Sequence, residues 1–158
     1  MSDERRGHVH TDGGWSMMEP GDTAVEDAIA AKLEAAWGCK LHRFAALHPI
    51  DFYAVKHDRM VAVVEIKSRG HASGTYPDVY LSVRKWTRLY EAAWMLNIRA
   101  FFVVQFTDGI RRIEVTDIDA SKHKIGGCNK VRSVSSREPV ILVDVKDMKE
   151  VKACESHT

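Results

Sequence analysis

The sequence predicts an α/β domain in which helices flank a central mixed β-sheet. Amphipathic segments with helical periodicity alternate with apolar, strand-like runs, which is the pattern of an α/β fold. The helices are expected at 23–37 and 83–97, and the strands at 41–47, 51–56, 60–68, 100–106, 110–116 and 140–145. The first six elements follow the order helix, three-strand meander, helix, strand.

A single domain is expected from residue 22 to residue 150, because 158 residues suffice for one hydrophobic core. Residues 1–21 are polar and Gly-rich with little periodicity, so we expect a flexible arm there, and a loose tail at 151–158. The Gly, Ser and His content of 70–77 predicts a mobile loop. The polar stretch 117–138 is expected to be a long loop with room for a short strand.

The composition is that of an ordinary globular protein. Hydrophobic residues make up 45% of the chain and charged residues 28%, as in ordinary globular proteins. Three widely spaced cysteines argue against a disulfide framework or a zinc site. No apolar run is long enough to span a membrane and the N-terminus is unlike a signal peptide, so we expect a cytoplasmic protein. The net charge of +1 excludes only a globally basic nucleic-acid binder.

The most informative residues are two acids and a lysine on neighbouring strands. Asp51 and Glu65 each lie seven residues from Asp58, so a hairpin centred on Asp58 would place them opposite each other. Opposed residues of an antiparallel pair have Cβ atoms about 5 Å apart on one face of the sheet. Lys67 would emerge on the same face as Glu65, since strand side chains alternate. The pattern therefore predicts that two carboxylates and an ammonium converge.

Such a cluster suits phosphodiester hydrolysis. Carboxylates can hold a hard divalent cation such as Mg²⁺, which orients a water and lowers its pKa. The backbone carbonyl of Ile66 could add an oxygen ligand, and Lys67 could hold the attacking water or stabilise the transition state. Alternatively, Glu65 and Lys67 could form the solvated face of a sheet. The run 61–64 is apolar at both parities and favours a strand covered on both sides.

Pro49, Asp51, Glu65 and Lys67 resemble the motif of the PD-(D/E)XK nuclease superfamily. The order of elements is also similar, and Tyr80-Leu81-Ser82 with Lys85 is similar to the small phage-type and Holliday-junction-resolvase-like members. The resemblance covers roughly 22–118. It implies a restriction-endonuclease-like core, dependence on Mg²⁺ or Mn²⁺, and hydrolysis of DNA that leaves a 5′-phosphate.

Glu26 has two interpretations. The resemblance implies a metal-contacting glutamate from the first helix, and Glu26 is the candidate, with Asp27 and Glu34 as weaker ones. However, Thr23-x-x-Glu26 also matches a capping box, in which Glu26 would bond to the backbone N–H of Thr23.

The start of the second helix is expected to bind phosphate. Ser82 is a good N-cap, and Arg84, Lys85 and Arg88 fall in the first two turns, where cations oppose the helix dipole. A bound anion would explain them, because helix N-termini attract phosphate. A solvated basic face is the alternative. The resemblance implies that Lys85 lies near the scissile phosphate.

Two further residues follow the presumed catalytic strand. Ser68 and Arg69 lead from it into loop 70–77 and could contact the DNA backbone. Tyr76 in that loop could stack on a base or could serve as a packing cap.

The leading hypothesis is a Mg²⁺- or Mn²⁺-dependent endonuclease acting on DNA, branched or otherwise structured, in phage or bacterial DNA processing. One alternative is a nucleic-acid-binding scaffold with little catalysis, and another is an interaction domain whose acid pair is coincidental. A homodimer would suit a branched substrate, since resolving a junction requires two active sites.

Overall fold

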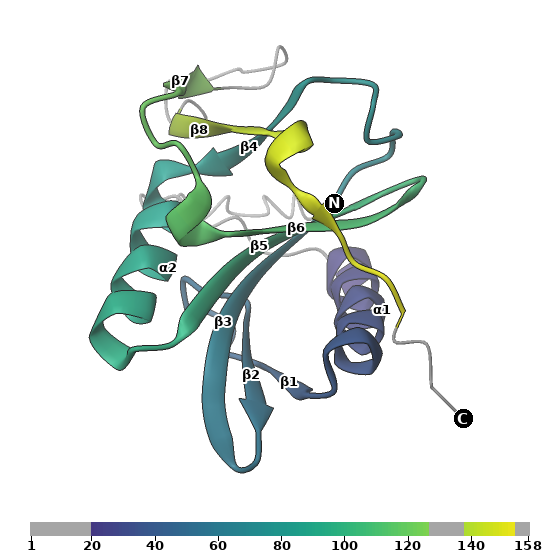
Figure 1. The fold of residues 1–158 in the computed structure, drawn as a ribbon, viewed down its shortest axis with the longest axis vertical. Coiled ribbons are helices and arrows are strands. Elements are labelled where there is room, and N and C mark those ends of the chain that lie inside the picture. Colours follow the sequence, from purple (N-terminus) through teal and green to yellow (C-terminus); the bar gives the residue numbers. More distant parts are fainter. Residues whose placement is uncertain (1–19, 127–137, 154–158) are drawn as a thin grey trace, which may run out of the picture.

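The computed structural model describes residues 20–126 and 138–153. Most of the predicted N-terminal arm, most of the C-terminal tail and 127–137 of the predicted long loop therefore lie outside the described residues (Figure 1). The main elements are α1 (Pro20–Trp37), β1 (Lys40–Arg43), β2 (Phe52–Lys56), β3 (Arg59–Ser68), β4 (Asp78–Ser82), α2 (Val83–Leu96), β5 (Arg99–Phe106), β6 (Gly109–Glu114), β7 (His123–Gly126), β8 (Glu138–Asp144) and β9 (Lys149–Glu150). Within the described residues, short 3₁₀ turns lie at Val115–Asp117 and Val145–Asp147.

The large sheet has six strands in the order β1-β2-β3-β5-β6-β9. Strands β3 and β5 pair in parallel and the other neighbours pair antiparallel, so the sheet is mixed. The parallel pair requires a crossover, which runs through β4 and α2. The predicted α/β fold with a central mixed sheet is confirmed.

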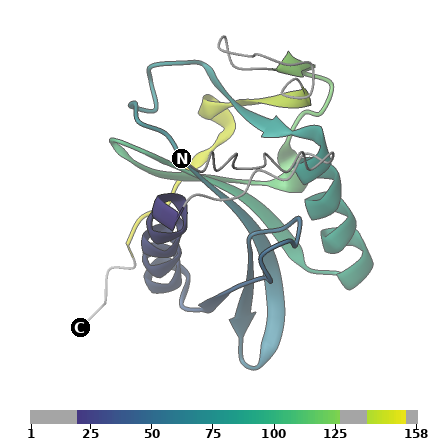
Figure 2. The same ribbon diagram turned by 180° about the vertical axis from the view of Figure 1, so that it is seen from behind.

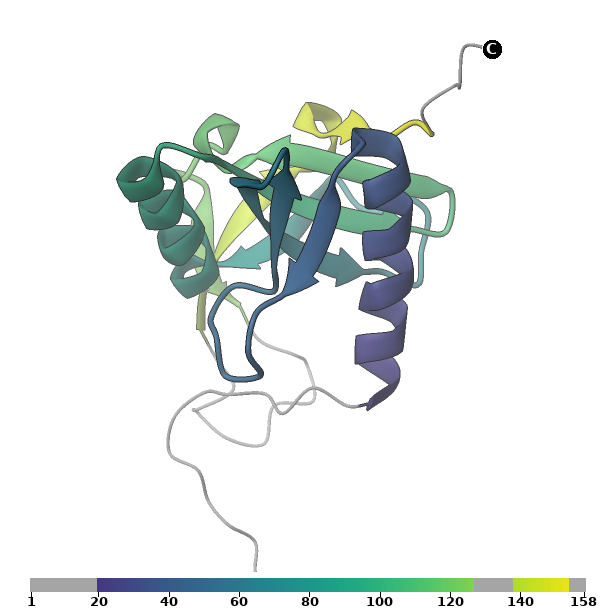
Figure 3. The ribbon, with the colours of Figure 1, turned by 90° about the horizontal axis from the view of Figure 1, so that it is seen from below.

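Both faces of the large sheet are covered. On one face, α2 and a small sheet pack against Val63, Phe102 and Val104. On the other face, α1 packs against Val64 and Val103. The two helices accordingly lie on opposite sides of the sheet (Figure 3), with β3 and β5 passing between them (Figure 2). Because both faces are covered, β3 carries apolar residues on both of its sides.

The small sheet, in the order β4-β8-β7, was not predicted as a sheet. Its strand β4 precedes α2 directly and pairs with β8, as in Tyr80↔Leu142. The sequence signal was present, since Asp78-Val79-Tyr80-Leu81-Ser82 alternates polar and apolar residues. The partner strand β8 corresponds to the strand predicted at 140–145, and β7 to the short strand for which the predicted loop 117–138 left room.

Several predicted boundaries were wrong by a few residues. Helix α1 begins at Pro20 rather than near Thr23, and β1 ends at Arg43 rather than at residue 47. Val151, expected in the loose tail, donates a backbone hydrogen bond to Ile110 O at 2.8 Å. No helix in the described ranges is long and apolar enough to cross a membrane.

The β2–β3 hairpin reaches the predicted register by a different route. Its turn is the two-residue pair His57-Asp58, both at positive φ (51° and 58°), as in a type I′ turn. A bulge next to Ala54 then shifts the register by one residue, so that Phe52 pairs with Val64. Continued by one residue, this register sets Asp51 opposite Glu65.

Loop 70–77 is anchored by hydrogen bonds, although its composition suggested mobility. Asp108 accepts hydrogen bonds from Ser73 N at 2.9 Å and Ser73 Oγ at 2.7 Å. Thr107 N donates to His71 O at 3.1 Å, and Val145 N donates to Pro77 O at 2.9 Å. These bonds hold the loop against the β5–β6 turn and against the end of β8.

The hairpin turn offers a test of the fold. The double substitution His57→Asn with Asp58→Gly should raise the free energy of unfolding by about 0.5–1 kcal/mol, because Asn-Gly adopts positive φ with less strain. Urea denaturation measures this. His57→Val, which places a β-branched residue at positive φ, should lower stability instead. If both variants are destabilised, the turn is not of type I′.

Candidate active site

Asp51, Glu65 and Lys85 meet at one point on the face of β3 that α2 covers. Lys85 Nζ lies 3.4 Å from Asp51 Oδ1 and 3.1 Å from Glu65 Oε2. The acids come from the β2–β3 hairpin and the lysine from the first turn of α2. The structure therefore brings the two predicted carboxylates together, and it places one of the predicted phosphate ligands between them.

Asp51 is positioned through its backbone and its side chain. Its carbonyl oxygen accepts a hydrogen bond from Phe44 N at 3.0 Å, which ties it to the end of β1. Its Oδ2 accepts one from Ile66 N at 3.1 Å, which ties it to β3. Oδ1 is directed at Lys85, so each side-chain oxygen has a separate partner.

Glu65 is a buried carboxylate, with only 3% of the residue exposed. Burial, followed by the negative charge of Asp51, raises its pKa to about 8, although Lys85 and Lys67 act in the opposite direction. The interpretation of Glu65 as part of a solvated face is wrong, since the strand is covered at this residue. A buried acid next to a second acid favours a nearby cation.

Two lysines compensate these acids from different directions. Lys67 is half-buried and lies two residues beyond Glu65 on the same face of β3. Burial alone would lower the pKa of Lys85, but the Glu65 and Asp51 carboxylates raise it above its ordinary value. Lys85 therefore stays charged between the acids, while Lys67 borders them toward the end of the strand.

Glu26 is paired with Arg43 rather than with the helix backbone. Arg43 Nη1 donates to Glu26 Oε2 at 2.8 Å, and Nη2 donates to Asp27 Oδ1 at 2.7 Å. The capping-box interpretation is wrong, because α1 begins at Pro20 and Thr23 is already inside the helix. Burial raises the pKa of Glu26, the Arg43 hydrogen bond opposes this, and the charge of Asp51 adds to it, so Glu26 lies near the acid pair.

The remaining predicted phosphate contacts are spread over two surfaces. Ser82 caps α2, with its Oγ accepting a hydrogen bond from Lys85 N at 3.4 Å. Arg84 and Arg88 are exposed on the same helix, and Arg88 lies 3.5 Å from Glu91. Ser68 is exposed but alternates to the face of β3 opposite Lys67. The structure therefore does not gather Ser68 with the acids.

The acid pair fits a divalent cation of the Mg²⁺ type. Within residues 20–126 and 138–153, no group of three or more His, Cys, Asp or Glu side chains could hold a metal. However, Asp51 and Glu65 both reach a single ammonium, so their oxygens converge on one cation-sized position. Mg²⁺ typically uses one or two protein carboxylates and keeps several waters. The N–H of Ile66 faces Asp51, so its carbonyl is expected on the same side of the strand.

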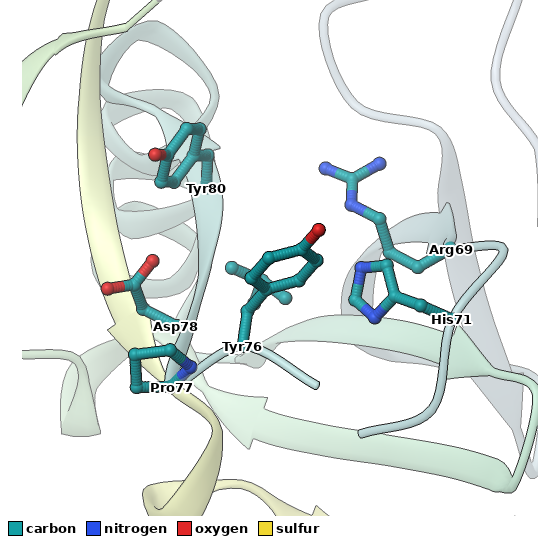
Figure 4. A pocket seen from close by; sticks show the side chains of 7 residues that line it. Arg69, His71, Tyr76, Pro77, Asp78 and Tyr80 are labelled. Carbon is teal, nitrogen blue, oxygen red and sulfur yellow. The ribbon is translucent and has the colours of Figure 1, made fainter. Parts of the chain in front are cut away.

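A pocket of about 270 Å³ lies beyond the end of β3, where Arg69 follows the strand (Figure 4). Arg69 and His71 line one side of it, Tyr76 projects from the loop, and Asp78 and Tyr80 contribute from β4. Arg69 was a predicted contact, but His71, Asp78 and Tyr80 were missed. The alternating pattern of β4 was the available signal for the last two.

The buried Glu65 predicts a pH dependence of stability. Because its pKa in the folded state is raised above 4.5 to about 8, its contribution is present at low pH and is lost as pH rises from 4.5 through 8. Glu65→Gln removes this loss. The variant should gain stability relative to the wild type by a few kcal/mol between pH 5 and pH 8, measured by urea denaturation.

Glu114 serves as a control because its pKa shifts in the opposite direction: its hydrogen bond to Arg99 lowers it. The difference between the wild type and Glu114→Gln should change little between pH 5 and pH 8, because its carboxyl titrates at or below its ordinary value of 4.5 in both states. Parallel curves for the wild type and Glu65→Gln would contradict the raised pKa.

Among solved structures, the chain is similar to Hjc of Archaeoglobus fulgidus, a Holliday junction resolvase from an archaeal hyperthermophile. The TM-score is 0.55 at 17% sequence identity, over 82% of this chain and 90% of that one. At this identity the similarity concerns the fold, and it agrees with the predicted restriction-endonuclease-like core. No curated protein matches the chain.

The family comparison covers more of the site. The model of the family described as "Phage putative PDDEXK endonuclease" matches residues 18–151. This range contains both helices, both sheets and the acid pair. The predicted membership of the PD-(D/E)XK superfamily is confirmed, and the chain belongs to its family of phage PDDEXK endonucleases.

Proposed function

We propose that this protein is a Mg²⁺- or Mn²⁺-dependent endonuclease that hydrolyses phosphodiester bonds in DNA. The observation that carries the proposal is the convergence of Asp51 and Glu65 on one cation position. Lys67 lies two residues after Glu65 on the same face of β3. Membership of an endonuclease family supports the reaction type. The divalent metal and DNA as the substrate belong to the proposal.

Asp51, Glu65 and the Ile66 carbonyl would hold the metal, with Glu26 assisting directly or through water. A divalent metal in such a site supplies an activated water and neutralises charge on the phosphate. The Arg43 pair would set the position of Glu26, so its contribution depends on how far that pair can open. The burial of Glu65 keeps bulk water from screening the site.

Lys67 would donate hydrogen bonds to the attacking water or to a phosphoryl oxygen. Its charge acts on Glu65, and it follows Glu65 toward the end of β3, where the scissile phosphate would approach. The phosphate gains negative charge on the way to the transition state, so a fixed cation stabilises the transition state more than the ground state.

The substrate strand would be held by backbone contacts. Arg84, Lys85 and Arg88 at the start of α2, with Arg69 at the end of β3, are the proposed phosphate contacts. Such contacts make affinity depend on salt and carry no sequence information. The fold similarity to a Holliday junction resolvase makes branched DNA a candidate substrate and a homodimer a candidate assembly. DNA processing in the cytoplasm is the corresponding setting.

Cleavage assays test the proposed roles. Asp51→Asn should abolish cutting of duplex, single-stranded and four-way-junction DNA in Mg²⁺ or Mn²⁺, since it removes one metal ligand. Lys67→Ala should lower the cleavage rate about 10²–10³-fold through the lost stabilisation of the transition state. Labelled substrates resolved on a denaturing gel measure both.

Arg88→Ala is the matched control. It removes an exposed cation and should weaken binding without stopping catalysis. Cutting by Asp51→Asn at the wild-type rate would refute the assignment. DNA binding without cutting by the wild type would instead favour a scaffold.

Replacing Lys85 should strengthen metal binding but slow DNA cleavage. Its ammonium takes the carboxylate oxygens that a metal would use, so Lys85→Ala should bind Mn²⁺ about tenfold more tightly. The same variant should cleave DNA more slowly, because it lacks a phosphate contact. Isothermal titration with Mn²⁺ alone measures the first effect. Arg84→Ala, which removes an exposed neighbour, should leave Mn²⁺ affinity unchanged, and no gain in Lys85→Ala would show that lysine and metal do not compete.

A further inference from the structure

The pocket at the end of β3 continues the row of side chains that forms the candidate active site. Glu65, Lys67 and Arg69 alternate onto the same face, and Arg69 N extends the strand ladder by donating to Gln105 O at 2.8 Å. At the rise of a β-strand, Arg69 starts about 6–7 Å beyond Lys67 and about 13 Å beyond Glu65. A DNA strand cleaved at the acids would therefore bring a nucleotide close to the cut into this pocket.

Arg69 presents an uncompensated cation to the pocket. It is half-buried, and burial lowers the pKa of its guanidinium. Its hydrogen bond is to Ser68 O at 3.3 Å, and no acid of the described part of the chain lies within ion-pair distance of it. A partly desolvated guanidinium favours an anion, and phosphate suits its geometry.

Tyr76 supplies an aromatic surface beside this cation. It is 58% exposed, so it does not serve as a buried packing cap. His71 contacts its ring edge-to-face, with centroids 4.9 Å apart. Ser73 donates hydrogen bonds to Asp108 and Val145 N donates to Pro77 O, and these bonds hold the loop on both sides of the ring. The tyrosine is therefore oriented before any ligand arrives, which lowers the entropic cost of stacking.

The far side of the pocket has different polarity. Figure 4 shows Asp78 on the Tyr80 side, away from Arg69. Lys124 Nζ lies 4.5 Å from the centroid of the Tyr80 ring, so a second cation lies close to this end of the pocket. The pocket thus offers a cation at one end, an aromatic ring at its middle and a carboxylate acceptor at the other. A nucleotide carries the matching groups, namely a phosphate, a flat base and exocyclic amino donors.

We propose that this pocket binds one unpaired nucleotide of the DNA substrate, with Arg69 on its phosphate and Tyr76 stacked on its base. The inference rests on the proposed function and narrows its substrate to DNA with an unpaired nucleotide next to the cut, as in forks, flaps and gaps. Bases inside a duplex are stacked on both sides and cannot reach Tyr76, whereas an unpaired base can turn outward and stack.

Binding measured in EDTA tests the pocket without cleavage. The probes are a fluorescein-labelled fork and a fully paired duplex of equal length, titrated with the full chain and read by anisotropy. The wild type should prefer the fork. Tyr76→Ala should weaken fork binding by about 5- to 150-fold, the range of one lost base–aromatic stack, with little effect on the duplex. Tyr76→Phe should retain the preference.

Trp94→Ala is the matched control, since Trp94 is 81% exposed on α2 and does not line the pocket. It should bind both probes like the wild type. A 2-aminopurine at the unpaired position gives a second readout, because its fluorescence should be quenched by the wild type and Tyr76→Phe but not by Tyr76→Ala. Equal binding of fork and duplex by the wild type, or equal losses in Tyr76→Ala and Trp94→Ala, would overturn the proposal.

The two proposals fail in distinguishable ways. Tyr76-dependent fork binding without cleavage in either Mg²⁺ or Mn²⁺ would refute the nuclease and leave the pocket intact. Metal-dependent cleavage with no effect of Tyr76→Ala on fork binding would refute only the pocket.

Discussion

The burial of Glu65 in a central strand is the constraint on which this end of the molecule depends. A carboxylate enclosed by apolar neighbours is costly to ionise, and Asp51 on the adjacent strand adds a second negative charge. The acids are therefore tolerated only where cations approach them. Lys85 does so from α2 and Lys67 from β3 itself, and a divalent metal would meet the same requirement.

This constraint links two parts of the fold that come from different stretches of the sequence. The β2–β3 hairpin contributes both acids, while the unit of β4 and α2 contributes the lysine. Leu81 and Leu89, both fully buried, pack this unit against Phe102 of the large sheet. Ser82 ends β4 and caps α2, so the first turn of the helix is fixed over the acids. Neither unit contains a complete site, and their packing in the shared core creates it.

The same arrangement extends the site along β3. Because every second residue of the strand faces the same side, the row of Glu65, Lys67 and Arg69 runs from the acids to the pocket. The row passes from negative to positive charge, as a phosphate backbone requires if one phosphate is cut and a neighbour is held. Strand β4, at the edge of the small sheet, borders the pocket on its other side.

Much of the fold and of the acid pair could be predicted because the signals are local. The helices follow from amphipathic periodicity, and the register of Asp51 with Glu65 follows from a short hairpin. The predicted strands 51–56 and 60–68 left residues 57–59 as the turn, which was wrong: a two-residue turn and a bulge together give the same offset. The capping box failed because α1 begins at Pro20, and the pairing of Glu26 with Arg43 of β1 has no local signature.

The sequence by itself determined the order of the two helices and of the strands β1, β2, β3, β5 and β6. It also determined the two acids, their lysine and their common face, because side-chain alternation and hairpin closure act over a few residues. Only the tertiary structure decided that Lys85 lies between acids 20 and 34 residues away, and that β4 pairs with β8 across the core. It also decided that Tyr76 and Arg69 border one pocket. These contacts join distant segments, and they depend on how apolar faces pack, which the pattern within any single segment does not specify.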